Sequence, residues 1–165
     1  GDTIRYDFSD IRNESSVPLD NFYWRDILPT DAVTLRSIST GTWNEELKYT
    51  IYYKTNLVSE ERALAERLST STNNTIDCSA SALKLKAGEV ITEIRFDFGT
   101  VQPGFEPVTN PYITCLVHPD LPHEYRFKNC TDVGGERGDE WVIDKDCWVT
   151  VIYAVPKGKL PKTGN

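Results

Sequence analysis

The stretch Val90-Ile91-Thr92-Glu93-Ile94-Arg95-Phe96-Asp97-Phe98 indicates the fold class, because apolar and polar side chains alternate along it. Successive side chains of a β-strand point to opposite faces of a sheet, so this period of two predicts a strand with one buried face. Residues 47–53, Leu-Lys-Tyr-Thr-Ile-Tyr-Tyr, alternate in the same way. Both stretches are also rich in β-branched and aromatic residues, which favour strands.

Similar stretches recur along most of the chain, at residues 3–11, 22–28, 33–38, 112–117, 124–130 and 147–155. The ten glycines and nine prolines fall mostly between them, where turns need them. Eight or more strands at intervals of about ten residues predict an all-β fold, an Ig-like antiparallel β-sandwich. Residues 60–68 are the exception, because Glu-Glu-Arg-Ala-Leu-Ala-Glu-Arg-Leu favours two turns of helix, with an edge strand as the alternative.

Size and charge indicate a soluble globular domain with an acidic surface. The chain has 165 residues, a net charge of −7 and a pI of about 4.9. Phosphate binding needs clustered Lys and Arg, so this acidity argues against a nucleic-acid partner and against anionic lipid. No stretch approaches the roughly 18 apolar residues of a membrane helix. Because methionine and a signal peptide are both absent, we expect a fragment or a mature form of an exported protein.

The last ten residues, Pro-Lys-Gly-Lys-Leu-Pro-Lys-Thr-Gly-Asn, differ in composition from the rest. Proline and glycine disfavour ladder pairing, so we predict a sandwich domain over residues 1–155 and a flexible, extended tail over residues 156–165. Within the tail, Leu160, Pro161, Lys162, Thr163 and Gly164 match L-P-x-T-G, the sorting signal of Gram-positive cell-wall proteins. At average residue usage such a match arises by chance in about 1% of chains of this length.

The resemblance to that signal implies a sortase as a transient partner. In the family, a sortase cysteine attacks the threonine carbonyl, here that of Thr163, and cleaves the bond to Gly164. The threonine is then joined to an amine of a peptidoglycan precursor or to a pilin lysine. Pro161 bends the tail for a groove, and Gly164 leaves room on the leaving side. The chemistry belongs to the sortase. We therefore expect a non-enzymatic, extracellular, cell wall-anchored monomer that needs no cofactor or metal.

The stretch from Asn13 to Pro29, NESSVPLDNFYWRDILP, resembles the conserved-repeat Ig-like domains of bacterial surface proteins. In that family a strand ends in Asn, a short turn leads to Pro-Leu, and an alternating strand runs to Asp-x-Leu-Pro. The matching positions are Asn13, Pro18, Leu19, Asp26, Leu28 and Pro29. The remainder resembles a longer Firmicute variant that ends in the sorting signal, through residues 52–56, 98–101, 103–105 and 131–135. The resemblance implies an Ig-like sandwich at the cell surface and little about ligands.

Four cysteines, Cys78, Cys115, Cys130 and Cys147, lie 37, 15 and 17 residues apart. None forms a C-x-x-C pair, which argues against a zinc or redox motif. Residues 133–138, Val-Gly-Gly-Glu-Arg-Gly, predict a loop between strands near Cys130 and Cys147, which would then be antiparallel neighbours. We therefore expect a Cys130–Cys147 disulfide and, by elimination, a Cys78–Cys115 disulfide. Buried free thiols are the alternative.

The favoured function is a wall-proximal stalk or spacer of an anchored surface protein or pilus subunit. The alternative is an adhesin-type module that recognises a host glycan or protein through exposed aromatic side chains. Two or more exposed, coplanar tryptophans among Trp24, Trp43, Trp141 and Trp148 would favour binding, whereas their burial would favour a spacer. An enzymatic function would need two carboxylates facing each other across a cleft, and the sequence shows no such pair.

Overall fold

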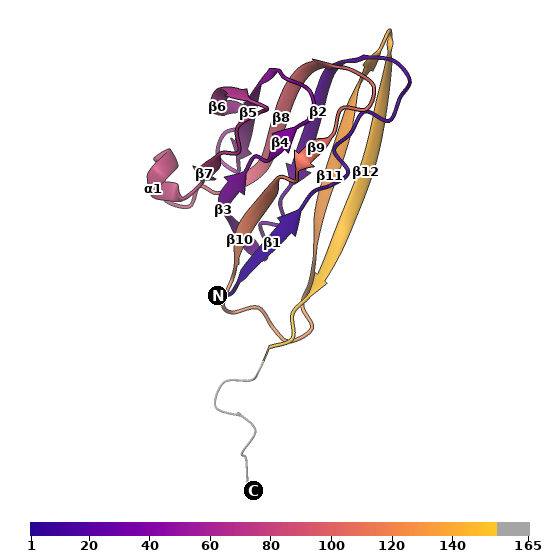
Figure 1. The fold of residues 1–165 in the computed structure, drawn as a ribbon. Coiled ribbons are helices and arrows are strands. Elements are labelled where there is room, and N and C mark those ends of the chain that lie inside the picture. Colours follow the sequence, from indigo (N-terminus) through magenta and orange to yellow (C-terminus); the bar gives the residue numbers. More distant parts are fainter. Residues whose placement is uncertain (155–165) are drawn as a thin grey trace, which may run out of the picture.

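The computed structural model describes residues 1–154 and shows two main antiparallel sheets packed as a sandwich (Figure 1). The smaller sheet has the strand order β1 (Thr3–Asp7), β10 (Tyr112–Val117), β3 (Val33–Ser39), β7 (Thr75–Asp77). The larger sheet has the order β12 (Glu140–Val151), β11 (Arg126–Arg137), β2 (Leu19–Ile27), β8 (Ile91–Val101), β5 (Lys48–Thr55), β6 (Arg62–Ser69). A short ribbon pairs β4 (Thr42–Trp43) with β9 (Pro107–Thr109). The predicted all-β, Ig-like antiparallel sandwich is confirmed, while the predicted tail lies outside the described residues.

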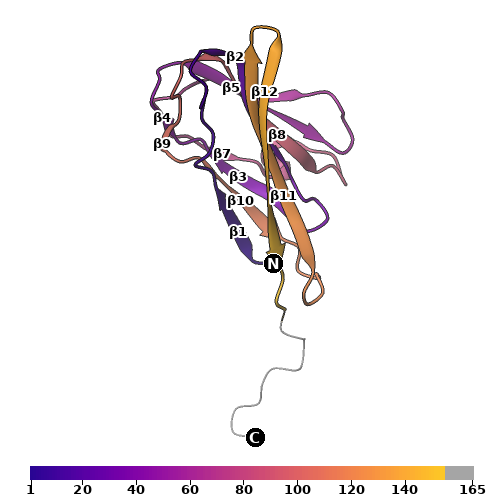
Figure 2. The same cartoon turned by 90° about the vertical axis from the view of Figure 1, so that its right-hand side faces the viewer.

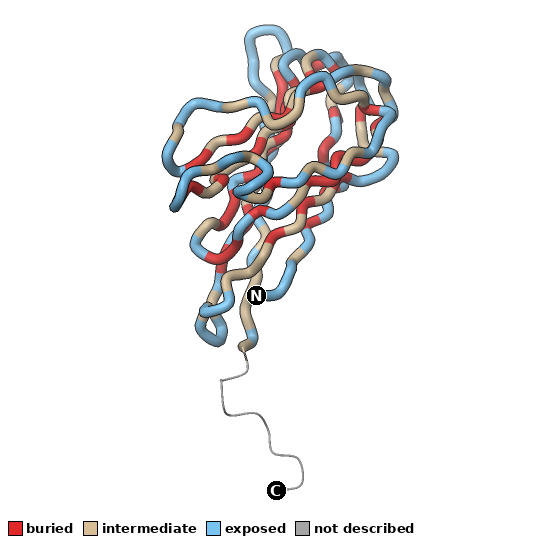
Figure 3. The backbone as a smooth tube through the Cα atoms, turned by 90° about the vertical axis from the view of Figure 1, so that its left-hand side faces the viewer, coloured by how far each residue is buried: buried red, intermediate tan, exposed pale blue. Residues whose placement is uncertain are grey.

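The hydrophobic core lies between the sheets, and buried residues alternate with more exposed ones along the strands (Figure 3). In β8, Ile94 and Phe96 are 0% exposed and Phe98 is 3% exposed, so the side chains between them face outward. Trp43 stacks on Phe105 with ring centroids 5.1 Å apart. Burying one large aromatic side chain contributes about 2–3 kcal/mol, so this aromatic cluster is a major source of stability.

The side chain of Asn13 organises the turn that leads into β2. Its Oδ1 accepts hydrogen bonds from the backbone N–H and the hydroxyl of Ser15, at 3.0 and 2.7 Å. Its Nδ2 donates to the carbonyl oxygen of Val17 at 3.0 Å. Asn13 is only 1% exposed, so these bonds satisfy a polar group that burial would otherwise penalise. Pro18 follows this turn, and β2 begins at the next residue, Leu19.

The helix predicted for residues 60–68 is wrong, because most of these residues form strand β6. This strand lies at the edge of the larger sheet and pairs antiparallel with β5, with Ala63 opposite Tyr52. Ala, Leu, Glu and Arg favour helices only weakly in isolation. Pairing with β5 satisfies the backbone of β6 and overrides that local preference.

The single helix among the described residues is α1 (Ala80–Leu83), a one-turn element between β7 and β8. Ser79 caps its N-terminus, because the Ser79 hydroxyl accepts a hydrogen bond from the Ala82 N–H at 3.2 Å. Lys84 adopts a left-handed conformation with φ of 53° and ends the helix. Within residues 1–154, no helix has the length and apolar character needed to cross a membrane.

Strands β11 and β12 form a long hairpin at one edge of the larger sheet. Their register runs from Arg126 opposite Val151 to Arg137 opposite Glu140, and the turn contains residues 138 and 139. The loop predicted for residues 133–138 is therefore corrected, since β11 continues to Arg137. Gly134 suits this strand because an added Cβ would lie only 2.5 Å from the carbonyl oxygen of Val142.

The N-terminus and the end of β12 lie at the same end of the molecule, opposite the β11–β12 turn (Figures 1 and 2). Near the N-terminus, the carbonyl oxygen of Asp2 accepts a hydrogen bond from Val117 N–H at 2.7 Å. Just beyond β12, Ile152 N–H donates to the carbonyl oxygen of Tyr125 at 2.9 Å. Backbone bonds thus hold both ends of the described chain against the sandwich.

Candidate functional site

The predicted sorting residues, Leu160, Pro161, Lys162, Thr163 and Gly164, all lie outside the described residues. The described chain ends at Ala154, whose N–H donates to His123 Nδ1 at 3.1 Å. Leu160 follows Ala154 by six positions in the sequence. The structure therefore describes the chain up to two residues before the predicted tail, and the motif itself stays a prediction.

The predicted Cys130–Cys147 disulfide is formed. The two cysteines lie directly opposite each other in the β11–β12 register, on the outward face of the hairpin. The disulfide closes a loop with a sequence separation of 17 residues. It thus ties the edge strand covalently to β11, its one neighbour among the described strands.

The predicted Cys78–Cys115 disulfide is corrected, because both cysteines are free and buried. They flank β3 on opposite sides: Cys115 pairs with Leu35, and Cys78 N–H donates to the Arg36 carbonyl oxygen at 2.8 Å. The two cysteines are therefore separated by two strand spacings, which amount to about 9.6 Å. A disulfide needs Cα atoms that are about 4.4–6.8 Å apart. Burial raises the pKa of each thiol to about 12, so both thiols are unreactive near neutral pH.

The four tryptophans differ sharply in exposure. Trp24 is 2% exposed and Trp43 is 6% exposed, so both belong to the core. Trp148 is partly buried and packs against the core, whereas Trp141 is 52% exposed on the outer side of β12. The criterion of two or more exposed, coplanar tryptophans is therefore not met.

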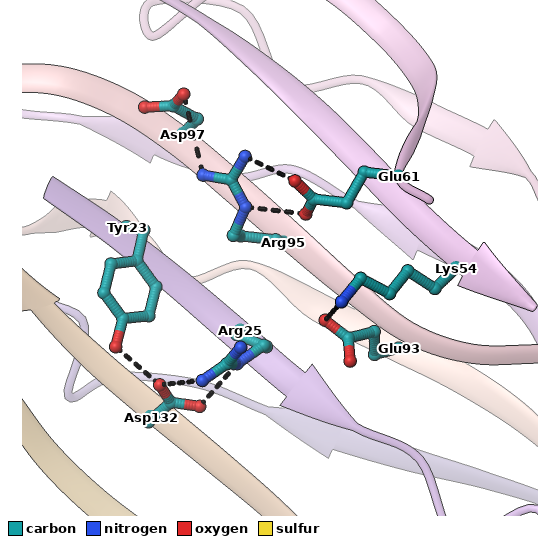
Figure 4. A network of polar contacts seen from close by, with 8 residues as sticks. All are labelled: Tyr23, Arg25, Lys54, Glu61, Glu93, Arg95, Asp97 and Asp132. Carbon is teal, nitrogen blue, oxygen red and sulfur yellow. Dashed lines mark hydrogen bonds and ion pairs between the residues drawn. The ribbon is translucent and has the colours of Figure 1, made fainter. Parts of the chain in front are cut away.

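The outer face of the larger sheet carries a network of paired charges (Figure 4). Arg25 on β2 makes a bidentate contact with Asp132 on β11, through Nε at 3.0 Å and Nη2 at 2.9 Å. The hydroxyl of Tyr23 donates to the same carboxylate at 2.6 Å. Burial, and then the bond to Asp132, raise the pKa of Tyr23 above its ordinary value, so the phenol stays protonated.

A second arginine lies directly opposite Arg25, because Arg95 on β8 pairs with it in the strand register. Like charges in this position repel, so each needs a carboxylate of its own. Arg95 contacts Glu61 through two hydrogen bonds of 2.7 and 2.9 Å, and its Nη1 lies 3.6 Å from Asp97. The guanidinium lowers the pKa of Glu61 chiefly through this hydrogen bonding. These arginines and carboxylates satisfy one another, which suits a rigid surface rather than proton-transfer chemistry.

A shallow hollow of about 390 Å³ lies beside this network, with Trp141 and Ile143 of β12 on one side. Tyr23 and Trp141 meet edge to face with ring centroids 6.1 Å apart. Arg25 and Arg95 line the other side of the hollow. An exposed aromatic ring beside fixed hydrogen-bonding groups is a feature of this face that could contact a ligand.

A buried polar pair lies inside the sandwich, near β1. Asp26 and Asn129 are both 0% exposed, and Asn129 Nδ2 donates to Asp26 Oδ2 at 3.0 Å. Asp26 Oδ1, the amide oxygen of Asn129 and the Tyr6 hydroxyl have no hydrogen-bond partner within the described chain. Burial raises the pKa of Asp26 to about 7, and the bond from Asn129 opposes that rise.

Sequence reasoning missed both the charged network and this buried pair. The outward positions of Arg95 and Asp97 follow from the alternation of β8, but their partners depend on strand order, which alternation does not give. Among residues 1–154, no group of three or more His, Cys, Asp or Glu side chains converges as a metal site.

Comparisons with protein families, with curated proteins and with solved structures give no significant match to this chain. The assignment of function therefore depends on the sequence motif and on the geometry described above.

Proposed function

We propose that this chain is a non-catalytic segment of a cell-surface protein that a sortase joins to peptidoglycan through residues 160–164. The observation that carries the proposal is the position of Leu-Pro-Lys-Thr-Gly, a few residues after β12, the last described strand of the sandwich. A disulfide at the surface of that same hairpin supports an oxidising, extracellular setting.

The proposed reaction exchanges one amide bond for another. The sortase thiolate attacks the carbonyl carbon of Thr163, the bond to Gly164 breaks, and Gly164-Asn165 leaves as a protonated amine. An amine of a peptidoglycan precursor, or a pilin lysine, then attacks the thioester and releases the sortase thiol. A folded strand could not present this carbonyl in a near-attack geometry, so a site beyond β12 suits the reaction.

The position of the chain ends refines the stalk function. Because the N-terminus and the end of β12 share one end of the sandwich, the β11–β12 turn would point away from an anchored tail (Figure 2). Any region joined before residue 1 would emerge at that same end. The domain would then act as a pedestal beside the anchor rather than as one unit of a straight rod.

The test is in vitro transpeptidation of the chain with a purified Gram-positive sortase and triglycine, followed by mass spectrometry. We expect loss of Gly164-Asn165 and gain of triglycine at Thr163. Thr163→Ala should abolish the exchange, whereas Lys162→Ala, at the variable position of the motif, should retain it. If several sortase classes leave the chain intact but exchange a free peptide of the same five residues, anchoring through this tail is wrong.

A second candidate function, recognition of a host glycan or protein, is favoured by the exposed ring of Trp141 beside the hollow on the outer face. Truncating a stacking aromatic removes most of its contact area, so Trp141→Ala should abolish binding to a host glycan array or to host cells. Val149→Ala is the matched control, because Val149 is 57% exposed on the same strand and does not line the hollow. Equal binding by both variants would argue for the pedestal alone.

A further inference from the structure

A second cleft, separate from the hollow on the outer face, opens at the side of the sandwich. It lies between the inner side of the β11–β12 hairpin and residues 7–14, which are the end of β1 and the chain after it. Its volume is about 340 Å³, which is at the lower end of the range for small-ligand sites. β12 is the edge strand of the larger sheet here, with β11 beside it.

The floor of this side cleft is aromatic. Phe8 packs on Trp24 with ring centroids 4.5 Å apart and meets Trp148 edge to face at 5.8 Å. Trp24 is fixed in the core at 2% exposure, whereas Trp148 is only partly buried. Indole rings present a negative face, so a floor of this kind favours a cation with an apolar stem.

The walls of the cleft are strongly acidic. Five carboxylates line it, those of Asp7, Asp10, Glu14, Asp144 and Asp146, together with two cations, Arg12 and Lys145. Arg5 pairs with Asp7 at 2.8 Å, and Arg12 lies 3.8 Å from Glu106 outside the cleft. Within the described chain, the remaining four carboxylates make no ion pair, so the cleft carries uncompensated negative charge.

Two of these carboxylates face the cleft from the edge strand. In the register of the hairpin, Asp144 lies opposite Val133, and Asp146 lies opposite Thr131. Thr131 lines the cleft from the neighbouring strand β11 and is 8% exposed.

We propose that this cleft binds an organic cation, the side-chain ammonium of lysine in a peptide being the chemistry that it fits. The ammonium lies between Asp144 and Asp146 and donates to their carboxylates and to the Thr131 hydroxyl. The methylene stem packs on Trp148, where the ring adds a cation–π contribution. A divalent metal ion fits less well, since no three ligating side chains converge in the described chain.

The probe is n-butylammonium, a model of the lysine side chain, titrated into the isotope-labelled full chain and followed by NMR. We expect saturable shifts of the Trp148 indole N–H and of the backbone amides of residues 144–146. Half-saturation should fall in the millimolar range, since a single ion pair and one cation–π contact are individually weak. n-Butanol, the neutral analogue, should produce no saturable shift at these positions.

Two double variants that each remove two negative charges distinguish binding at this cleft from non-specific attraction to an acidic protein. Asp144→Asn with Asp146→Asn should weaken binding by about tenfold, whereas Asp139→Asn with Glu140→Gln, at the hairpin turn and outside the cleft, should leave it unchanged. Trp148→Phe keeps an aromatic ring and should weaken binding by a few fold, and the same spectra show that each variant is folded. Linear shifts, equal loss in both double variants, or equal binding of n-butanol would overturn the proposal.

Discussion

Asp26 is a carboxylic acid in the core of a domain whose other acidic groups face solvent or bind a cation or hydroxyl. Two orphaned oxygens, one on Asp26 and one on Asn129, belong to side chains that already share a hydrogen bond. A proton on Asp26 Oδ1 could donate to Asn129 Oδ1 and satisfy both atoms at once. We therefore infer that Asp26 is neutral in the folded protein at mildly acidic pH, which agrees with its raised pKa of about 7.

This inference predicts the direction of a pH dependence. The pKa of Asp26 is about 7 when folded and about 4 when unfolded, so the folded state holds the extra proton between these values. The free energy of unfolding is therefore highest, as far as Asp26 contributes, below pH 4. It falls as the pH rises from 4 to 7, and the total decrease is at most roughly 4 kcal/mol. Asp26→Asn should remove this loss, so its advantage over the wild type should grow from near zero at pH 4 to several kcal/mol at pH 8.

Urea unfolding of both proteins at pH 4, 6 and 8 measures this difference directly. Asp26→Leu is the control, because it also removes the titration but leaves the Asn129 amide without a partner. Its stability difference from the wild type should show the same pH dependence, offset by a constant loss of about 1–3 kcal/mol. Parallel curves for Asp26→Asn and the wild type would mean that Asp26 does not titrate in this range.

The pattern of β2 could have placed Asp26 in the core, since Trp24 and Leu28, two residues away on either side, are both buried. Strand alternation therefore predicts which face a residue occupies. It could not predict Asn129 as the partner, because β11 lies more than one hundred residues away in sequence. The same limit applies to the contact between Arg25 and Asp132.

At the scale of elements, strand existence was predictable and strand ends were not. The alternation at residues 47–53 and 90–98 predicted β5 and β8 close to their true places. The helix predicted at residues 60–68 was wrong because helix propensity depends only on local sequence, whereas β6 forms through its pairing with β5. Three glycines suggested a loop at residues 133–138, but a close approach of neighbouring backbone explains Gly134.

The β11–β12 hairpin provides the prediction at this scale. A disulfide restricts the unfolded chain, and a loop of about 15 residues corresponds to roughly 3 kcal/mol of stability. Replacing both Cys130 and Cys147 by serine should therefore lower the free energy of unfolding by about 3 kcal/mol, measured in urea. Reductant should destabilise the wild type by a similar amount and leave the double variant unchanged. Equal stability of the two oxidised proteins would show that strand pairing alone holds β12.

At the scale of the whole molecule, the disulfide lies on the path of any force that enters through the tail. Only four residues, Trp148–Val151, separate Cys147 from the end of β12. Within residues 1–154, β12 is an edge strand that pairs with β11 alone, so in a reduced hairpin it could be peeled away one hydrogen bond at a time. With the disulfide closed, force passes at Cys147 into β11, which is held on both sides by β12 and β2.

Stretching single molecules between the N-terminus and the tail would reveal this path. The reduced chain should show an early, low-force event in which β12, 12 residues long, detaches and releases about 40 Å of contour length. The oxidised chain should lack that event, and its total contour length should be shorter by about 60 Å, since the 17-residue separation stays closed. The serine double variant should behave like the reduced wild type with or without reductant. Identical early traces for the oxidised and reduced chains would mean that force enters the sandwich elsewhere, with β1, the other terminal strand, as the first to yield.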